Sequence, residues 1–451
     1  MLDPITVGVL GLAVLFVLLI LRMPVGIAMI VVGIGGTWVL SLFVPFVRFV
    51  PYIRQFKSLL WENVANYDLS VVPLFVLMGY IAAEARLSRL RGGVAMAAVA
   101  ACGGFGAVCG SSLATAATMG KVALPELRKL GYDPRLASGA LAAGGTLGIL
   151  IPPSVALVIY AIIVEGSILK MFQAAVIPGM MAVLGFILVI AVSVKLNPAL
   201  APEPKPMARA ERRVALRRLV PVLTIFGAII LGLGFGLFTP TPAASIGVFA
   251  ITVYGFVLRW VTGEGLGLAG LVRAVRSTAI TAGMIYLILF GAEVLKGFFT
   301  RTGLPQALSD WAATSGLDPM LILVIMLVIF VVLGCFMESL AMILVVVPFF
   351  WPTLIALNGG DFATADTAAF GMDNDSLKIW FGILALIVVE LGLITPPVGL
   401  NVFIIASLAQ NTRMATVFRG VMPFLGAEVI RVAILLMIPA LTLVVPRWLG
   451  G

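Results

Sequence analysis

Five residues that carry a hydroxyl group or no side chain lie together in an otherwise apolar region of the chain. Gly110, Ser111, Ser112, Thr115 and Thr118 fall within nine positions, although 62% of the 451 residues are hydrophobic. Hydroxyl oxygens and freed carbonyls suit a dehydrated Na⁺, and the exposed N-termini of half-helices suit an anion. A polar turn inside a membrane needs such a reason, because unsatisfied polar groups are costly there.

Two paired prolines add a second source of free oxygen atoms. Pro152-Pro153 and Pro396-Pro397 each interrupt an apolar stretch. Proline has no N–H group, so each pair leaves nearby carbonyls without their helical partners. Irregular backbone at membrane depth is tolerated where it is buried in protein or lines a cavity. We therefore expect two broken helices, near residues 136–165 and 379–410.

The composition indicates an integral membrane protein. The mean hydropathy is +1.18 and only 11% of the residues are charged, whereas about a quarter are charged in soluble domains. Every spanning segment must be helical, because lipid offers the backbone no hydrogen bonds. The expected fold class is therefore all-α. Candidate spans lie near residues 5–22, 24–46, 71–85, 136–165, 174–196, 219–238, 243–261, 277–299, 318–337, 379–395, 396–410 and 421–446.

The chain lacks the residues that several kinds of enzyme require. It has no histidine and three scattered cysteines, Cys102, Cys109 and Cys335. His-dependent zinc sites and Ser-His-Asp triads are thereby excluded, and we expect no enzyme. We attribute the net charge of +9 to basic cytoplasmic loops, so no nucleic-acid partner is expected.

One basic segment, residues 201–218, divides the chain into halves at 1–200 and 219–451. Excess Lys and Arg favour the cytoplasmic side, so we expect this linker to be cytoplasmic. Its basic residues are Lys205, Arg209, Arg212, Arg213, Arg217 and Arg218.

The two halves share a pattern. "SSLATAATMGKVALPE" and "ESLAMILVVVPFFWPT" place Ser112 and Ser339 at the same offset as Pro125 and Pro352 (339 − 112 = 352 − 125 = 227). Two matched interruptions in two halves are typical of secondary transporters. Small residues can also serve helix packing alone, which is the alternative. Hairpins are expected near residues 92–125 and 334–357.

The paired prolines follow a second offset, because Pro152 matches Pro396 (396 − 152 = 244). The extra 17 residues (244 − 227) correspond to the acidic insertion "GGDFATADTAAFGMDND". Glu390 lies just before the second pair, where an acid costs about 2.5–3.5 kcal/mol on membrane-insertion scales. It either tunes an ion site or pairs with a Lys or Arg of a neighbouring helix.

Three motifs make the chain recognisable. "GSSLATAATMGKVALPELRKLGYD", "GGTLGILIPPSVALVIYAIIVEGSI" and "ELGLITPPVGLNVFI" resemble the large membrane (M) subunit of TRAP (tripartite ATP-independent periplasmic) transporters. The resemblance implies an inverted-repeat, elevator-type fold with two re-entrant hairpins and two broken helices. It also implies Na⁺-coupled secondary active uptake of a small organic anion, a carboxylate, across the bacterial inner membrane. The implied partners are a small membrane (Q) subunit and a periplasmic substrate-binding (P) protein.

The same resemblance assigns residues to the hairpin tips and the broken helices. The substrate would contact Ser111, Thr115, Ser154, Glu338, Pro396 and Asn401. The coupling Na⁺ would contact Gly110, Ser112, Pro152, Ser339, Thr395 and Gly399. The sequence departs from the family pattern at residues 359–378, where it carries a longer acidic loop.

Two other classes stay open at this stage. A stand-alone Na⁺/dicarboxylate carrier would have a similar hairpin architecture but would need no binding protein. A channel would need polar residues along several parallel helices, and its flux would not saturate with substrate.

Overall fold

The computed structural model describes most of the chain. The described residues are 3–21, 23–45, 47–65, 73–74, 77–78, 95–109, 111–202, 224–225, 227–229, 231–233, 235, 237–263, 265–409 and 412–449. Gly110, most of the expected span 71–85 and the basic linker from residue 203 onward lie outside them.

All regular elements in the described residues are helical, which confirms the all-α prediction. The first half contains α1 (Pro4–Ile20), α2 (Val25–Phe43), α3 (Phe49–Arg54), α4 (Phe56–Ala65), α6 (Ala95–Cys109), α7 (Ser112–Lys129), α8 (Pro134–Gly145), α9 (Leu147–Leu150), α10 (Val155–Ile163), α11 (Ile168–Leu196) and the 3₁₀ turn η2 (Pro198–Leu200). The second half contains α13 (Pro240–Thr262), α14 (Leu268–Thr302), α15 (Leu304–Thr314), α16 (Pro319–Gly334), α17 (Ser339–Asn358), α18 (Asn374–Ile394), α19 (Leu400–Leu408), α20 (Met414–Met437) and α21 (Ala440–Leu449).

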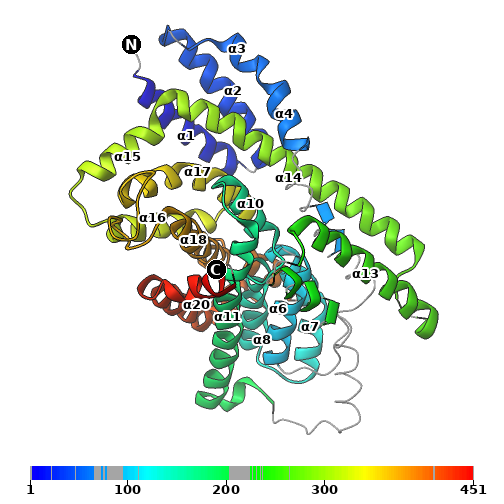
Figure 1. Cartoon of the computed structure of the whole chain (residues 1–451). Helices are drawn as coiled ribbons and strands as arrows, with labels where there is room; N and C mark the ends of the chain where they lie inside the picture. The colour runs from blue at the N-terminus through cyan, green and yellow to red at the C-terminus, as the bar shows by residue number, and fades with distance from the viewer. Residues whose placement is uncertain are drawn as a thin grey trace.

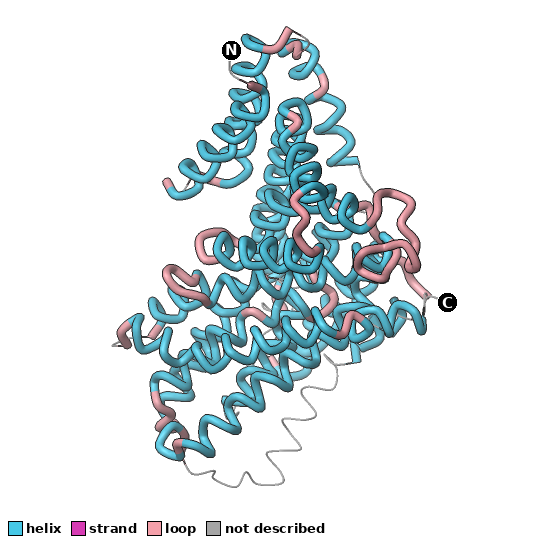
Figure 2. Tube along the Cα trace, turned by 90° about the vertical axis from the view of Figure 1, so that its left-hand side faces the viewer, coloured by secondary structure: helices cyan, strands magenta, loops and turns pink. Residues whose placement is uncertain are grey.

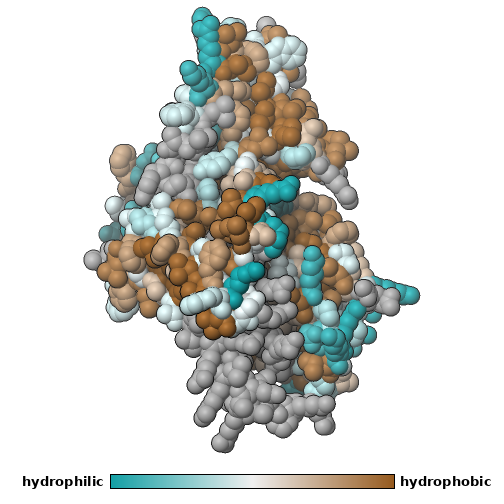
Figure 3. All heavy atoms as spheres, turned by 90° about the vertical axis from the view of Figure 1, so that its right-hand side faces the viewer, coloured by the Kyte–Doolittle hydropathy of each residue, from teal (hydrophilic) through white to brown (hydrophobic). Residues whose placement is uncertain are grey.

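Several of these helices suit a membrane environment. Within the described residues, seven are long and apolar enough to cross a bilayer, or eight if the bent pair Pro134–Leu150 and Val155–Ile163 is one span. Large apolar side chains such as Phe249, Val253 and Val257 are exposed on α13. Figure 3 shows apolar side chains spread over much of one face. Soluble proteins rarely expose such large apolar areas, so this surface fits contact with lipid.

The first hairpin and the first broken helix form one compact unit. Helices α6 and α7 pack against each other and against α8. The chain then runs through α8 and α9 to the break at Pro152-Pro153 and continues at 47° as α10. Ser111 and Ser154 cap the helices that leave the tip and the break, because their hydroxyls accept backbone N–H bonds from Ala114 and Leu157.

Two helices, α16 and α17, cover the region of the expected second hairpin. The region 318–337 was expected to span, with the hairpin near 334–357. The structure forms α16, which ends at Gly334, and the chain returns as α17, which packs against it. At 16 residues, α16 is about 24 Å long, which is shorter than the ~30 Å hydrocarbon core. The length of α16 is compatible with the arm of a hairpin, and the bounds of the second hairpin stay a prediction.

Helix α18 lies at the centre of the molecule. In its most apolar window 94% of the residues are buried, against 33–61% in the other candidate spans. It packs against α16, α17, α11 and α20. Figure 1 shows α16, α17 and α18 together, with α6, α7 and α8 in a neighbouring group and the long α14 along the outside beside α1 and α2. The second hairpin therefore packs directly on this buried helix, and the first-half unit meets it through α9 and α10.

The acidic insertion forms a defined loop between α17 and α18. Asn358 Nδ2 donates to Met372 O over 3.0 Å, and Asn374 Nδ2 donates to Gly360 O over 2.9 Å. Two asparagines at the ends of adjacent helices thus hold the start and the end of the loop together. Figure 2 shows this loop at one edge of the molecule, near the C-terminus.

Candidate functional site

Ser112 and Ser339, which the repeat offset relates to each other, both contact one carboxylate. Ser112 Oγ donates to Glu390 Oε2 over 2.6 Å, and Ser339 Oγ donates to Glu390 Oε1 over 2.7 Å. All three side chains are buried; Glu390 is 1% exposed. The residues lie far apart along the chain, so the fold alone brings them together. Within the described residues no ion pair involves Glu390, so the alternative of a Lys or Arg partner is not found there.

Helix geometry places these groups. Ser112 and Ser339 are the first residues of α7 and α17, so the N-termini of both helices point at the Glu390 carboxylate. Each helix N-terminus carries roughly half a positive charge, which favours an anion. Glu390 itself lies close to the C-terminal end of α18, where an acid is disfavoured. Two opposing helix ends thus compensate part of a charge that its own helix does not stabilise.

The space between the two tips is small. Ser111, Ser112, Glu338 and Ser339 line a cavity of about 10 Å³, together with Leu113, Ile149 and Leu340. A cavity of this volume holds about one water molecule. In this conformation the tips therefore leave room for an ion or a water molecule, and not for an organic acid at Ser111 and Glu338.

Two buried oxygen atoms beside the first tip have no hydrogen-bond partner. They are Thr115 Oγ1 and Asn401 Oδ1, in side chains that are 0% exposed. A Cβ atom at Gly148 would lie 2.9 Å from Thr115 Oγ1, and one at Gly145 would lie 3.1 Å from Asn401 Nδ2. Only glycine at these positions lets α8 and α9 approach so closely. Buried unpaired oxygens are rare and suggest a water or an ion, and oxygen ligands of this kind suit Na⁺.

Asn401 joins the second half to the first tip. It lies in α19, and its Nδ2 donates to Ala142 O of α8 over 3.5 Å. A Cβ atom at Gly145 would also lie 3.3 Å from the carbonyl oxygen of Ser112. The structure thus brings Ser112, Thr115 and Asn401 into one neighbourhood, although the resemblance assigned Ser112 to the cation and the other two residues to the substrate.

The second break opens near the second tip. Pro397 has no N–H to donate to Leu393 O, and Gly399, with φ +57°, begins α19 facing that carbonyl and Thr395 O. Thr395 Oγ1 donates to Leu391 O over 2.6 Å, so its lone pairs stay available. Pro396 is exposed, and its carbonyl lies 3.5 Å from Cys335 Sγ, next to the tip. These residues offer oxygen atoms beside the second hairpin.

The first break, at Pro152-Pro153, does not face the cavity between the tips. Pro152 is buried and lines an apolar pocket of about 340 Å³ against α11. Ser154 Oγ already accepts the N–H of Leu157 as a helix cap. The structure thus places Ser154 in a capping role and Pro152 away from the tip cavity. Neither joins Ser112 and Thr115 in this conformation.

Sequence reasoning missed a buried ion pair behind the site. Arg431 and Glu428 of α20 pair with each other, and Arg431 Nη1 donates to Pro178 O over 2.9 Å. Both side chains are at most 5% exposed. Their spacing of three residues in an apolar helix was the available signal. The pair keeps Arg431 occupied, so it does not neutralise Glu390.

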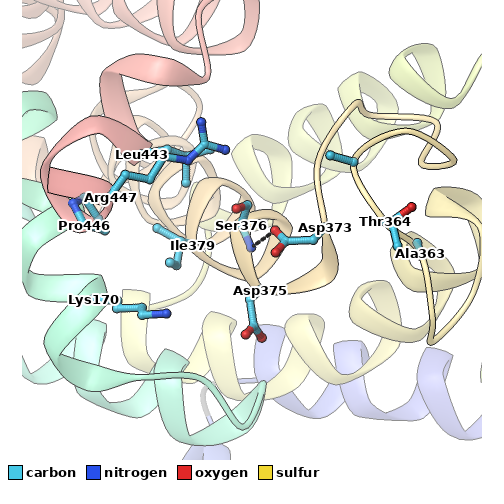
Figure 4. A pocket seen from close by; sticks show the side chains of 11 residues that line it. Lys170, Ala363, Thr364, Asp373, Asp375, Ser376, Ile379, Leu443, Pro446 and Arg447 are labelled. Atoms are coloured by element: carbon cyan, nitrogen blue, oxygen red, sulfur yellow. Dashed lines mark hydrogen bonds between the residues drawn. The ribbon is translucent and has the colours of Figure 1, made fainter. Parts of the chain in front are cut away.

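A separate polar pocket lies at the N-terminal ends of α11 and α18. Its volume is about 600 Å³, and Lys170, Asp373 and Arg447 line it (Figure 4). Hydrogen bonds from Ser376 hold the pKa of Asp373 below its ordinary value, and the charges of Arg447 and Lys170 add to the effect. Asp373 caps α18 by accepting the Ser376 N–H over 2.9 Å. None of the site residues expected from the sequence lines this pocket.

The comparison with known protein families decides the identity of the chain. Residues 12–441 match the family described as "Tripartite ATP-independent periplasmic transporter, DctM component". The chain belongs to this family. It is therefore a multi-pass membrane subunit of a TRAP transporter, and family members are transporters and not enzymes.

Individual relatives extend over nearly the whole chain. The C4-dicarboxylate TRAP transporter large permease protein DctM of Pseudomonas aeruginosa is 32% identical over 93% of this chain and 94% of its own length. The sialic acid TRAP transporter large permease protein SiaM of Vibrio cholerae is 28% identical over 86% of this chain and 88% of its own. Relatives named for different solutes thus share this architecture.

A solved structure supports the fold. The crystal structure of the Alcanivorax borkumensis YdaH transporter, described as having an unusual topology, superposes with a TM-score of 0.61. It is 13% identical and covers 94% of this chain and 97% of that chain. At this identity the likeness concerns the fold alone.

Proposed function

We propose that this subunit carries a small organic anion, a carboxylate, into the cell by symport with Na⁺. The observation that carries the proposal is the convergence of Ser112 and Ser339 on Glu390, beside the unpaired oxygens of Thr115 and Asn401. Family membership and relatives named for C4-dicarboxylates and sialic acid support the class of solute.

The charges at the tips give a physical reason for coupling. The N-termini of α7 and α17 attract a carboxylate, but Glu338 and Glu390 repel it when they are ionised. A Na⁺ held by the tip oxygens would cancel part of this repulsion and so raise the affinity for the anion. Linkage is reciprocal, so the bound anion would raise the affinity for Na⁺ by the same factor. Transport of both together follows, with an elevator-like movement of the hairpin unit as the expected step.

The family description calls the transporter tripartite, which implies two partner proteins besides this chain. We propose a periplasmic binding protein that delivers the anion and a small membrane subunit that accompanies this chain in the bacterial inner membrane. The tip cavity of about 10 Å³ must open to admit a solute, and in this proposal docking of the loaded binding protein triggers the opening.

Uptake into proteoliposomes tests the proposal. The chain, its small subunit and its binding protein are reconstituted, and the labelled acid is the one that raises the Tm of the binding protein most in a screen. An inward Na⁺ gradient should drive accumulation, an equal K⁺ gradient should not, and omitting the binding protein should abolish uptake. Equal uptake with K⁺ contradicts Na⁺ coupling. Concentrative uptake by the chain alone favours a stand-alone carrier.

Sidedness is a second test. Helix α11 has 29 residues, about 43 Å, and runs from the pocket at Lys170 toward the basic linker. If the linker is cytoplasmic, the loop at Ala365 must be periplasmic. In a chain without Cys102, Cys109 and Cys335, a membrane-impermeant maleimide added outside spheroplasts should label Ala365→Cys and not Arg213→Cys. The reverse pattern contradicts the proposed orientation.

A further inference from the structure

Glu390 serves both hairpins with one side chain. Its two carboxylate oxygens accept one hydroxyl each, from Ser112 and from Ser339. The repeat offset relates the two serines, but Glu390 has no counterpart in the first half, since position 146 (390 − 244) is Thr146. Thr146 donates its hydroxyl to Ala143 O and so turns to its own helix. A single acid of the second half therefore receives both serines.

The direction of these hydrogen bonds fixes what the serines can do. An ionised carboxylate only accepts hydrogen bonds, and a serine hydroxyl has one proton. Both hydroxyls must therefore donate to Glu390 when it is ionised, which leaves only their lone pairs for a third partner. A hydroxyl oriented in this way is an acceptor, which a cation requires. Groups that orient ligands in this manner typically alter metal affinity by about 10–100-fold when they are changed.

When Glu390 is ionised, its charge is only partly balanced. The N-termini of α7 and α17 supply about half a positive charge each at best, and Glu338 is a nearby acid of the same sign. Arg431 lies on the adjacent α20 but is paired with Glu428 and hydrogen-bonded to Pro178 O. A cation between the tips would complete the balance.

We propose that Glu390 is a positioning residue that orients Ser112 and Ser339 as paired acceptors for the coupling cation and links the two hairpin tips through its charge. The proposal rests on the proposed Na⁺ symport. Glu390 does not itself bind the cation in this account; it acts through the two serines. The alternative is that Glu390 only clamps the tips together by hydrogen bonds.

Thermal stability of the purified chain separates the two roles without any substrate or partner. A ligand that binds only the folded state raises its stability with concentration. We define the Na⁺ midpoint as the Na⁺ concentration that gives half of the maximal rise in Tm, with KCl keeping the ionic strength constant. If the wild-type chain shows no rise with Na⁺, the proposed symport fails, and the role of Glu390 fails with it.

Glu390→Gln is the main variant. It keeps the size of the side chain but removes the charge and replaces one acceptor by a donor. We expect the Na⁺ midpoint to rise at least tenfold, while the Tm in K⁺ alone stays equal or increases because an incompletely balanced buried charge is gone. A clamp would instead give a lower Tm by the same amount in both salts, with an unchanged Na⁺ midpoint. That result overturns the proposal while leaving the symport intact.

Two further variants complete the experiment. Glu126→Gln makes the same change on α7 at an exposed site, 14 residues from Ser112, and should leave the Na⁺ midpoint unchanged. Glu390→Asp keeps the charge but shortens the reach, so one carboxylate no longer bridges both serines. We expect its Na⁺ midpoint to rise about threefold or more, but by less than that of Glu390→Gln. A wild-type midpoint in Glu390→Asp also overturns the proposal, even if the Gln variant does not fold.

Discussion

The two hairpin tips share a serine and differ in almost everything around it. Ser112 and Ser339 both start a helix and both donate to Glu390. One turn further, the first tip has Thr115 and the second has Met342 (115 + 227 = 342). The hydroxyl of Thr115 is buried and unpaired, whereas Met342 is a buried apolar side chain. Repeat symmetry thus extends to the serines, and the additional oxygens belong to the first tip.

The two broken helices also differ, but here the second one carries the additional oxygen atoms. Asn401 and Thr395 of the second break correspond to Leu157 and Ile151 of the first (401 − 244 and 395 − 244). Asn401 reaches across to the first tip, where Thr115 lies. The first half therefore supplies the oxygen atom of Thr115, and the second half supplies that of Asn401. From this difference we propose that the oxygen atoms form one composite site made by both halves.

The largest effect on the composite site is expected when Asn401 is replaced by leucine, the residue at the corresponding position of the first half. Asn401→Leu keeps a similar volume but removes the unpaired Oδ1. We expect the Na⁺ midpoint to rise on the order of 100-fold, the upper end for changes around a metal site. The Tm in K⁺ should not fall by more than a degree or so, because a buried polar group is replaced by an apolar one. An unchanged midpoint would remove Asn401 from the site.

Thr115→Val tests the first tip itself. The substitution keeps the branched shape and deletes the unpaired hydroxyl, so the Na⁺ midpoint should rise about tenfold. Met342→Leu, at the corresponding position of the second tip, is the matched control and should leave the midpoint unchanged. Equal shifts in the two variants would mean that the tips respond to packing, and that the oxygen of Thr115 has no special role.

Sequence and structure agree on the serines for a physical reason. A helix start after a turn is a local feature, so the offset of 227 between Ser112 and Ser339 can be recognised in the amino-acid sequence. Their common partner was not, because Glu390 reaches them only through tertiary packing across 278 and 51 residues. The sequence marked Glu390 as an acid in an apolar span, and it left open whether a cation or another group would face it.

The extent of the second hairpin stays a prediction, because composition cannot define it. The apolar composition of α16 is the same for an arm that turns back and for a span, so residues 318–337 read as a span. The chain reverses at Cys335–Glu338, and no strong turn residue other than Gly334 marks the place. By contrast, the paired prolines located both breaks, because missing N–H groups are a property of the residues themselves.

The smallest expected effect concerns the caps of the two broken helices. Asp133 caps α8 by accepting the Arg135 N–H, and Asp373 caps α18 by accepting the Ser376 N–H. Replacing either with Ala should lower the stability by about 0.5–1 kcal/mol, the low end for exposed caps, without moving the Na⁺ midpoint. A shifted midpoint in either variant would show that the caps are part of the ion site.

Asp373 adds a pH dependence of known sign. Its pKa is lowered in the folded chain, so its contribution to stability is present above the unfolded pKa of about 3.9 and is lost as the pH falls through the lower folded value. Scans of Tm against pH should therefore show the wild type and Asp373→Ala converging toward pH 3. Curves that stay parallel down to that pH would contradict the role of the charged cap.

The most direct test of the composite site is a double-mutant cycle between the two tip serines. Ser112→Ala, Ser339→Ala and the double variant are purified, and the Na⁺ midpoint of each is measured by thermal unfolding in Na⁺/K⁺ mixtures. If both hydroxyls act on one cation through Glu390, the change in the double variant should differ from the product of the single changes by at least about twofold, a coupling of ~0.5 kcal/mol or more. Independent, multiplicative changes would contradict a shared site and return the two tips to separate roles.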